Sequence, residues 1–249
     1  MSITIGDWTA TVTGDPLPVT PRFTGNSVDV AGHADRQERE RFLAATFGSR
    51  EGLWDASGVL RFDRDSRQLV GAEFRMPYAW ADSETSARVP VMPAVRPGGV
   101  RADQVRDFRL EMCTVLCRAP GDEVLVCLRD PGALDGPPEA RIGIAPDVTL
   151  LARHGTVAGW SLTDPARYLT TGFADPDPAP PSEATRRLLG ECLDLVGRPV
   201  FDEVADGDPA ALARLRAVDE ALRAQREDRH RADALLALIG TLVEDCGDW

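Results

Sequence analysis

Lysine is missing from this sequence of 249 residues, so all 28 of its basic side chains are arginines. Without lysine the chain has no side-chain amine for a Schiff base, which excludes the lysine-dependent chemistry of pyridoxal-phosphate enzymes and class I aldolases. The phosphate-binding lysine of P-loop proteins and the lysine of protein kinases are excluded for the same reason. Arginine-only usage with abundant Ala, Asp, Gly and Pro is typical of a GC-rich bacterial genome, and we expect a bacterial source.

The chain also lacks long apolar runs and an excess of positive charge. No run approaches the ~20 apolar residues of a membrane helix. The opening MSITIGDWTATVTGD has neither the basic nor the apolar region of a signal peptide. We therefore expect a cytoplasmic protein that does not enter a membrane. The formal charge of −12 argues against nucleic-acid binding. It favours either attraction of a basic protein or solubility alone.

Patterns typical of catalysis are scarce. No G-x-G-x-x-G follows an expected strand, and no G-x-S-x-G is present. His154 falls at an expected hairpin tip and His230 in a polar stretch of helix, which leaves His33 as the one histidine worth retaining. Asp63 and Asp65 have the spacing of a divalent-cation pair, but Asp, Arg and Ser together are typical of a solvated turn. We assign no metal and no cofactor, and we lean towards a protein that is not an enzyme.

The middle of the chain, about 53–162, carries β-strand patterns. A half-buried hairpin is expected over 59–76, and another over 148–162 that turns at His154-Gly155. Residues 88–95 alternate but contain prolines, which indicates an edge strand or an extended loop. A helix is predicted over 35–47, with Asp35 as its cap.

A proline-rich stretch, ADPDPAPP at 174–181, is the best candidate for a boundary. The residues after it are helical in pattern. Between 210 and 239 no Gly or Pro interrupts, so we predict one long helix of about 45 Å. The polar run RAQREDRHRAD leaves open an antiparallel pair that breaks near 226–230. The predicted fold is α+β: a mainly antiparallel sheet domain with an N-terminal helix at 1–173, the linker at 174–181, and a helical subdomain at 182–249.

Three of the five cysteines lie in FRLEMCTVLCRAPGDEVLVCLR, residues 108–129. An odd number of cysteines in a long chain does not suggest a disulfide framework. Cys113 and Cys117 are four residues apart, which on a strand separates them by ~13 Å. That separation excludes a shared metal and a disulfide between these two.

Cys117 and Cys127 remain a conditional pair, because their relation depends on the register of the hairpin. If Pro120 faces Val124 across a three-residue loop, the two cysteines lie opposite each other and form a candidate redox pair. If Ala119 faces Val124, they do not. In that case all three cysteines act as small apolar core residues, which is the interpretation we favour.

The stretch MPYAWADSE, residues 76–84, is the most typical of a protein-binding surface. It places Tyr78 and Trp80 beside Asp82 and Glu84, and aromatic anchors flanked by acids suit a basic partner. The alternative is that the two aromatic rings close one end of the sheet while the acids are solvated.

The sequence thus favours a non-enzymatic cytoplasmic protein-binding module, most plainly an acidic inhibitor, immunity-type or antitoxin-like protein that masks a basic partner. The alternative is an enzyme or small-molecule-binding protein whose sheet domain has an anion cleft lined by arginines such as Arg61, Arg75 or Arg109. A third hypothesis is an adaptor that self-associates through the C-terminal helix.

Overall fold

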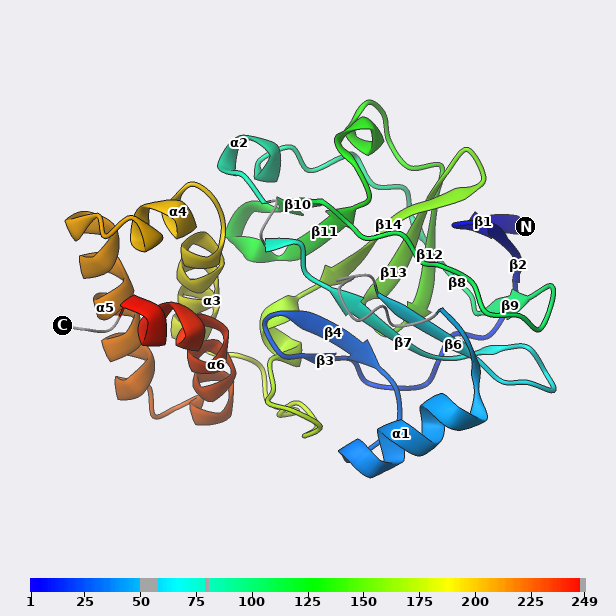
Figure 1. Cartoon of the computed structure of the whole chain (residues 1–249), viewed down its shortest axis with the longest axis horizontal. Helices are drawn as coiled ribbons and strands as arrows, with labels where there is room; N and C mark the ends of the chain where they lie inside the picture. Colours follow the sequence, from blue (N-terminus) through cyan, green and yellow to red (C-terminus); the bar gives the residue numbers. More distant parts are fainter. Residues whose placement is uncertain (50–57, 79–80, 247–249) are drawn as a thin grey trace.

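The computed structural model describes residues 1–49, 58–78 and 81–246, and it has an α+β fold. Two β-sheets form the larger part of the molecule, and helices from the C-terminal quarter of the chain pack at one end of it (Figure 1). Within the described residues, no helix combines the length and the apolar character needed to cross a membrane.

The larger sheet contains nine described strands in the order β8-β12-β13-β14-β1-β2-β9, with β11 also beside β14 and β10 beside β11. The β8–β12 and β1–β14 pairs are parallel and the others are antiparallel. The bounds of its strands are β1 (Ser2–Ile5), β2 (Trp8–Val12), β8 (Val95–Pro97), β9 (Val100–Ala102), β10 (Val115–Arg118), β11 (Val124–Leu128), β12 (Ala140–Ala145), β13 (Val148–Arg153) and β14 (Thr156–Thr163).

The smaller sheet is antiparallel, with five described strands in the order β3-β4-β7-β6-β5. Its strands are β3 (Arg22–Phe23), β4 (Ser27–Val30), β5 (Phe47–Gly48), β6 (Val59–Phe62) and β7 (Leu69–Arg75). The predicted hairpin over 59–76 is therefore present as β6 and β7. Aromatic rings fill the core: Trp8 stacks on Phe108 at 4.5 Å between centroids, and Phe74 on Trp160 at 5.2 Å.

Helix α1 (Arg36–Ala45) begins where the sequence predicted, since the Asp35 side chain accepts from the amide of Glu38. It ends earlier than predicted. The Thr46 hydroxyl and amide both donate to the carbonyl of Phe42, and Phe47 enters strand β5 instead of the helix. Burial of the Phe47 ring at 1% exposure explains this change, because the strand points the ring into the core.

The hairpin of β13 and β14 turns where the sequence predicted, at His154 and Gly155. His154 and Gly155 both have positive φ, 50° and 71°, in the turn between β13 and β14. In the cysteine-containing hairpin, β10 begins only at Val115, so Cys113 lies outside the strand. Phe108 forms an isolated β-bridge with Ser49, and the Thr114 amide donates to the Leu128 carbonyl at 2.9 Å. Short helical turns are α2 (Ser83–Ser86), η2 (Pro120–Asp122), η3 (Pro131–Leu134) and η4 (Pro165–Tyr168).

The C-terminal region contains α3 (Glu183–Val196), α4 (Val200–Ala205), α5 (Pro209–Ala224) and α6 (Arg229–Cys246). The prediction of one long helix over 210–239 is wrong, and the alternative of a broken pair is correct. Gln225 leaves the helix at φ −64° and ψ 123°. The break buries the apolar residues of both halves against α3 and each other, including Leu215, Leu222, Leu235 and Ile239 at 0% exposure.

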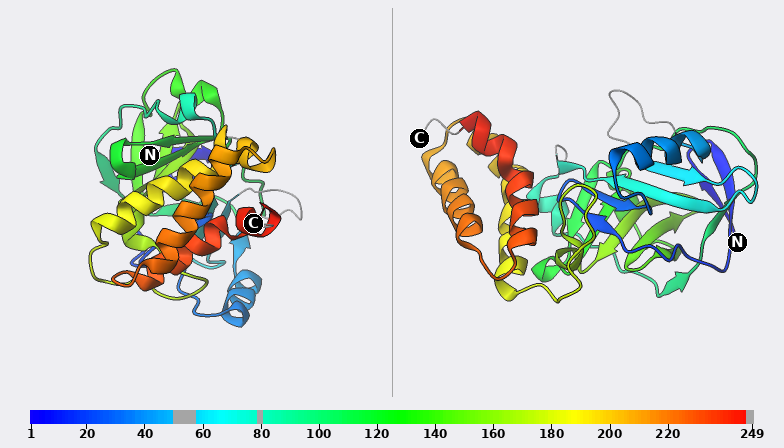
Figure 2. Two further views of the ribbon diagram at one scale, coloured as in Figure 1. Left: turned by 90° about the vertical axis from the view of Figure 1, so that its left-hand side faces the viewer. Right: turned by 90° about the horizontal axis from the view of Figure 1, so that it is seen from below.

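The C-terminal helices lie together at one end of the molecule, beside the sheets (Figure 2). Helices and sheets share one continuous hydrophobic core, and arginine side chains join them. Arg118 of β10 bonds Asp122 at 2.6 and 2.9 Å, and its Nη1 lies 2.6 Å from Asp194 of α3. Residues 174–181 form no helix or strand, but Arg231 of α6 donates to the carbonyls of Asp177 and Ala179. The boundaries predicted for the sheet domain, linker and helical subdomain remain predictions.

Candidate functional site

The cysteine hairpin takes the register in which its cysteines do not meet. The Ala119 amide donates to the Val124 carbonyl at 2.9 Å, so Cys127 lies opposite Leu116 and Cys117 lies opposite Val126. Neighbouring positions on a strand point to opposite faces. The hypothesis of a Cys117–Cys127 redox pair is therefore corrected, because a four-residue loop shifts the ladder by one position.

The described thiols are held in their protonated form. Burial raises the pKa of Cys113 to about 12, of Cys117 to about 11 and of Cys192 to about 12. Burial also raises the pKa of Cys127 well above its usual value. The thiolate is the reactive and metal-binding form of cysteine, so these side chains are poor nucleophiles. Among the described residues there is also no group of three or more His, Cys, Asp and Glu side chains that could hold a metal ion.

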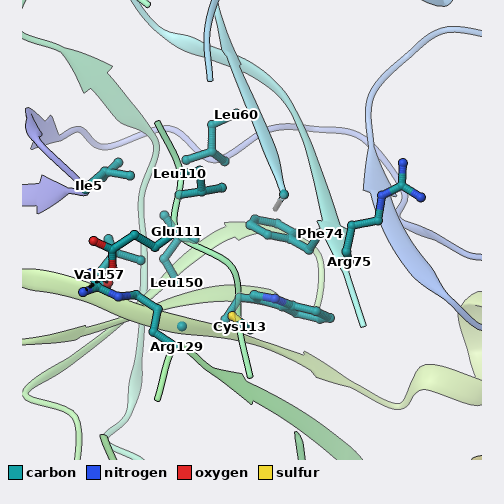
Figure 3. Close-up of a pocket in the computed structure, with 14 residues that line it drawn as sticks. Ile5, Leu60, Phe74, Arg75, Leu110, Glu111, Cys113, Arg129, Leu150 and Val157 are labelled. Carbon is teal, nitrogen blue, oxygen red and sulfur yellow. Dashed lines mark hydrogen bonds and ion pairs between the residues drawn. The ribbon is translucent and has the colours of Figure 1, made fainter. Parts of the chain in front are cut away.

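Cys113 borders a small cavity of about 30 Å³ beside Leu60, Phe74 and Leu110 (Figure 3). Its polar edge is an ion pair, with Arg129 Nη2 2.5 Å from Glu111 Oε2. The volume holds about one water molecule. This cavity is too small for a substrate, and we interpret it as a packing defect near the sheet core.

The predicted arginine cleft is not assembled from the arginines named for it. Arg61 donates to the carbonyls of Leu43, Thr46 and Ser49, so it ties the end of α1 to β6. Arg75 pairs with Glu73 at 2.9 Å and points away from the small cavity. Arg109 lies on the surface. These three side chains do not converge on one site.

The acid–aromatic loop is only partly available to a partner. The Tyr78 ring packs against the core, its hydroxyl donates to the carbonyl of Gly25, and burial raises its pKa well above the usual value. Asp82 caps α2 by accepting from the amide of Thr85 at 2.8 Å. Glu84 is exposed. Trp80 lies outside the described residues, so the loop as a binding surface stays a prediction that now rests on Asp82 and Glu84.

A second acid–aromatic element lies on α4 and was missed in the sequence. Among the described residues, Phe201 is the one exposed aromatic side chain, at 40% exposure. The same stretch carries Asp202, Glu203, Asp206 and Asp208, all exposed, and the segment 200–208 contains no basic residue. We call Phe201 with these four acids the α4 corner. The signal VFDEVADGD was present in the sequence, but the exposure of the ring depends on how α4 packs.

A buried polar cluster surrounds His33. Arg22, at 3% exposure, donates to Asp29 Oδ2 at 2.6 Å and to the carbonyls of Ala31, His33 and Phe173. His33 Nε2 lies 3.3 Å from the same carboxylate oxygen. Burial raises the pKa of Asp29 to about 6, although Arg22 opposes that shift. Burial and the nearby Arg22 lower the pKa of His33. No nucleophilic hydroxyl or thiol is bonded to His33 in the described structure, so the cluster is not a hydrolase triad.

Asp63 closes the turn between β6 and β7. Its Oδ1 accepts from the amides of Asp65 and Ser66 and from the Ser66 hydroxyl at 2.7 Å. These hydrogen bonds lower the pKa of Asp63. The pattern is that of an aspartate that stabilises its own turn.

Comparison of this chain with protein-family models, with curated proteins and with solved structures found no match.

Proposed function

We propose that the protein is a non-enzymatic binding module that masks a basic protein partner, in the manner of an inhibitor or immunity-type protein. The observation that carries this proposal is the α4 corner, where an exposed aromatic ring lies among four acids. Aromatic side chains supply much of the energy of protein interfaces, and surrounding charges select the partner and speed its approach. The chemistry of the described thiols and histidines supports a binding role over a catalytic one.

The acids of the α4 corner are not committed to internal ion pairs to the same degree as others in the protein. Asp202 lies 3.3 Å from Arg198, and both are about half exposed. Glu203 and Asp206 form no ion pair within the described part of the chain, and Asp208 caps α5. These carboxylates are therefore available to pair with the Lys and Arg side chains of a basic partner.

The self-association hypothesis has less support. The apolar face of α6 packs inside the protein, with Ala232, Leu235 and Ile239 at 2%, 0% and 0% exposure. Of the described residues in α6, none is an exposed large hydrophobic side chain. A helix whose apolar stripe is already covered has little surface for a second copy.

The test is capture of a partner by the tagged full-length chain from its native host, followed by binding measurements on the purified pair. Two variants address the α4 corner: Phe201→Ser, and a triple change of Asp202→Asn, Glu203→Gln and Asp206→Asn. We expect each to raise the dissociation constant by about tenfold or more. The triple variant should also weaken the dependence of association rate on salt.

The matched control neutralises three exposed acids on loops of the sheet body: Asp65→Asn, Asp130→Asn and Asp135→Asn. It removes the same amount of charge and should retain most of the affinity. Equal losses in the control and the α4 triple variant would show that net charge, and not this corner, drives binding. Capture of no protein, or capture of an acidic one, would overturn the proposed function.

A further inference from the structure

A cavity of about 690 Å³ lies between the edge of the smaller sheet and the proline-rich stretch. Its walls come from residues 19–22, residues 31–34, Pro146, the η4 turn and residues 173–178. Small-molecule sites in proteins have volumes of roughly 300–1,000 Å³. The cavity is therefore of the right size for a ligand, unlike the small cavity beside Cys113.

The floor of this cavity is rigid and already neutral. Arg22 is held by one carboxylate and three carbonyl oxygens, and Asp29 balances its charge. The carbonyl of Phe173 is one of those acceptors, so Arg22 also fixes the start of the proline-rich wall. Because the Arg22 guanidinium already bonds these protein groups, it is not the anion-binding arginine that the sequence suggested for this domain.

Two nitrogen atoms beneath the floor lack a hydrogen-bond partner among the described residues. Arg22 Nε and His33 Nδ1 are both buried and make no hydrogen bond in the described structure. Both atoms are almost entirely covered by other protein atoms, so they do not present a hydrogen-bonding surface to a ligand in the cavity. Recognition of a ligand therefore depends on the groups at the rim and on the apolar wall.

The rim of the cavity carries one uncommitted charge of each sign. The Arg167 guanidinium lies over the Tyr168 ring, 5.8 Å from its centroid, and makes no ion pair with any described residue. Asp175 likewise has no ion-pair partner in the described ranges, and both residues are exposed. Asp177 is partly committed, because its Oδ1 accepts from the amide of Ala179. The apolar part of the wall includes Val19, Pro146, Phe173, Pro176 and Pro178.

We propose that this cavity binds a small zwitterion with an apolar body, such as a free apolar α-amino acid or a short apolar peptide. The carboxylate of the ligand pairs with Arg167, its ammonium group pairs with Asp175, and its apolar part contacts Phe173 and the prolines. Guanidinium–carboxylate pairing has a geometry that a neutral amide does not reproduce. This site is separate from the α4 corner, and its test needs no protein partner.

Calorimetric titration of the full-length protein tests the proposal, with L-phenylalanine, L-leucine and the dipeptide Leu-Leu as probes. Each probe is compared with its N-acetyl derivative, which lacks the ammonium group, and with its amide, which lacks the carboxylate. We expect saturable binding of at least one zwitterion and about tenfold weaker binding of both of its derivatives. Comparison of the amino acids with the dipeptide shows which distance between ammonium and carboxylate the cavity accommodates.

Two variants assign the charges. Arg167→Gln should abolish the preference for the zwitterion over its amide and leave the preference over the N-acetyl form. Asp175→Asn should do the reverse. Arg96→Gln and Asp65→Asn remove exposed charges elsewhere and should bind as the unaltered protein does.

Absence of saturable binding by every zwitterion at millimolar concentration would overturn the proposal. Equal affinity for the N-acetyl form or the amide would also overturn it, because the site would then recognise only an anion or only a cation. Unchanged preferences in both variants would remove Arg167 and Asp175 from the site.

Discussion

Replacement of Arg231 by methionine should destabilise the protein by about 3–5 kcal/mol. The Arg231 side chain is 1% exposed, and its Nη1 lies 2.7 Å from Asp228, itself 8% exposed. Its Nη2 donates to the carbonyls of Asp177 at 2.9 Å and Ala179 at 2.6 Å. Methionine fills much of the same space but leaves a buried carboxylate without its cation. Removing one partner of a buried ion pair costs about 3–5 kcal/mol.

Other contacts of Asp228 set the lower end of this range. Its Oδ2 still accepts from the Ser182 amide at 2.7 Å and the Thr185 hydroxyl at 2.6 Å, so the carboxylate remains partly satisfied. The assay is guanidinium unfolding followed by circular dichroism, with Arg187→Met as the control. Arg187 pairs with Glu191 on the surface at 60% exposure, and such a pair contributes about 0–1 kcal/mol.

The same variant should speed hydrogen exchange at the amide of Ala179, because the two hydrogen bonds from Arg231 to the carbonyls of Asp177 and Ala179 are lost. A destabilisation equal to that of Arg187→Met would refute the buried-pair reasoning. Unchanged exchange at Ala179 would show that residues 174–181 are not held through Arg231.

Three further outcomes follow from buried and capped groups. With Cys246 replaced by serine, the remaining four thiols should react slowly with a thiol reagent at pH 8 in the folded protein and rapidly in denaturant, since burial raises the pKa of each; one fast thiol in the folded state would contradict this. The Asp29 carboxyl should titrate near pH 6 in the folded protein, as measured by NMR, against 3.8 in the unfolded chain. Because the raised pKa favours the protonated form in the folded state, the stability contribution is present at pH 3 and falls by up to about 3 kcal/mol as pH rises through 6. A folded-state midpoint below 4.5 would exclude the burial effect. Asp82→Ala should cost about 1 kcal/mol in thermal unfolding through loss of the α2 cap, whereas Glu84→Ala should be close to neutral; equal effects would remove the cap from the explanation.

Local features of the fold were predictable because nearby residues specify them. Asp35 and Ser182 begin helices by accepting amide hydrogen bonds three residues ahead, and His154-Gly155 turns a hairpin through two positive φ angles. The α+β class and mainly antiparallel pairing followed from the strand patterns. The hairpin at 119–124 was predicted in two registers, because the sequence alone does not fix the length of its loop.

Non-local features were beyond the sequence. The division into two sheets depends on pairings such as β4 with β7, and the polar cluster depends on Arg22 reaching the carbonyl of a residue 151 positions away. The polar run near 226 is compatible both with a helix that projects into solvent and with a turn. The packing of α5 against α6 decides between these two structures. For the same reason Phe201 could be read as a core residue until its exposure was known.

The distribution of acids matters more for recognition than the net charge of −12. Several carboxylates are used internally: Asp122 and Asp194 hold Arg118, and Asp228 holds Arg231. Neutralising them would change stability before it changed binding. Glu203 and Asp206 do no such structural work in the described chain, so their charge acts mainly on what approaches from solvent. A basic partner should therefore respond to these two acids at low salt and lose that response as screening shortens the reach of exposed charges to about 8 Å at physiological salt.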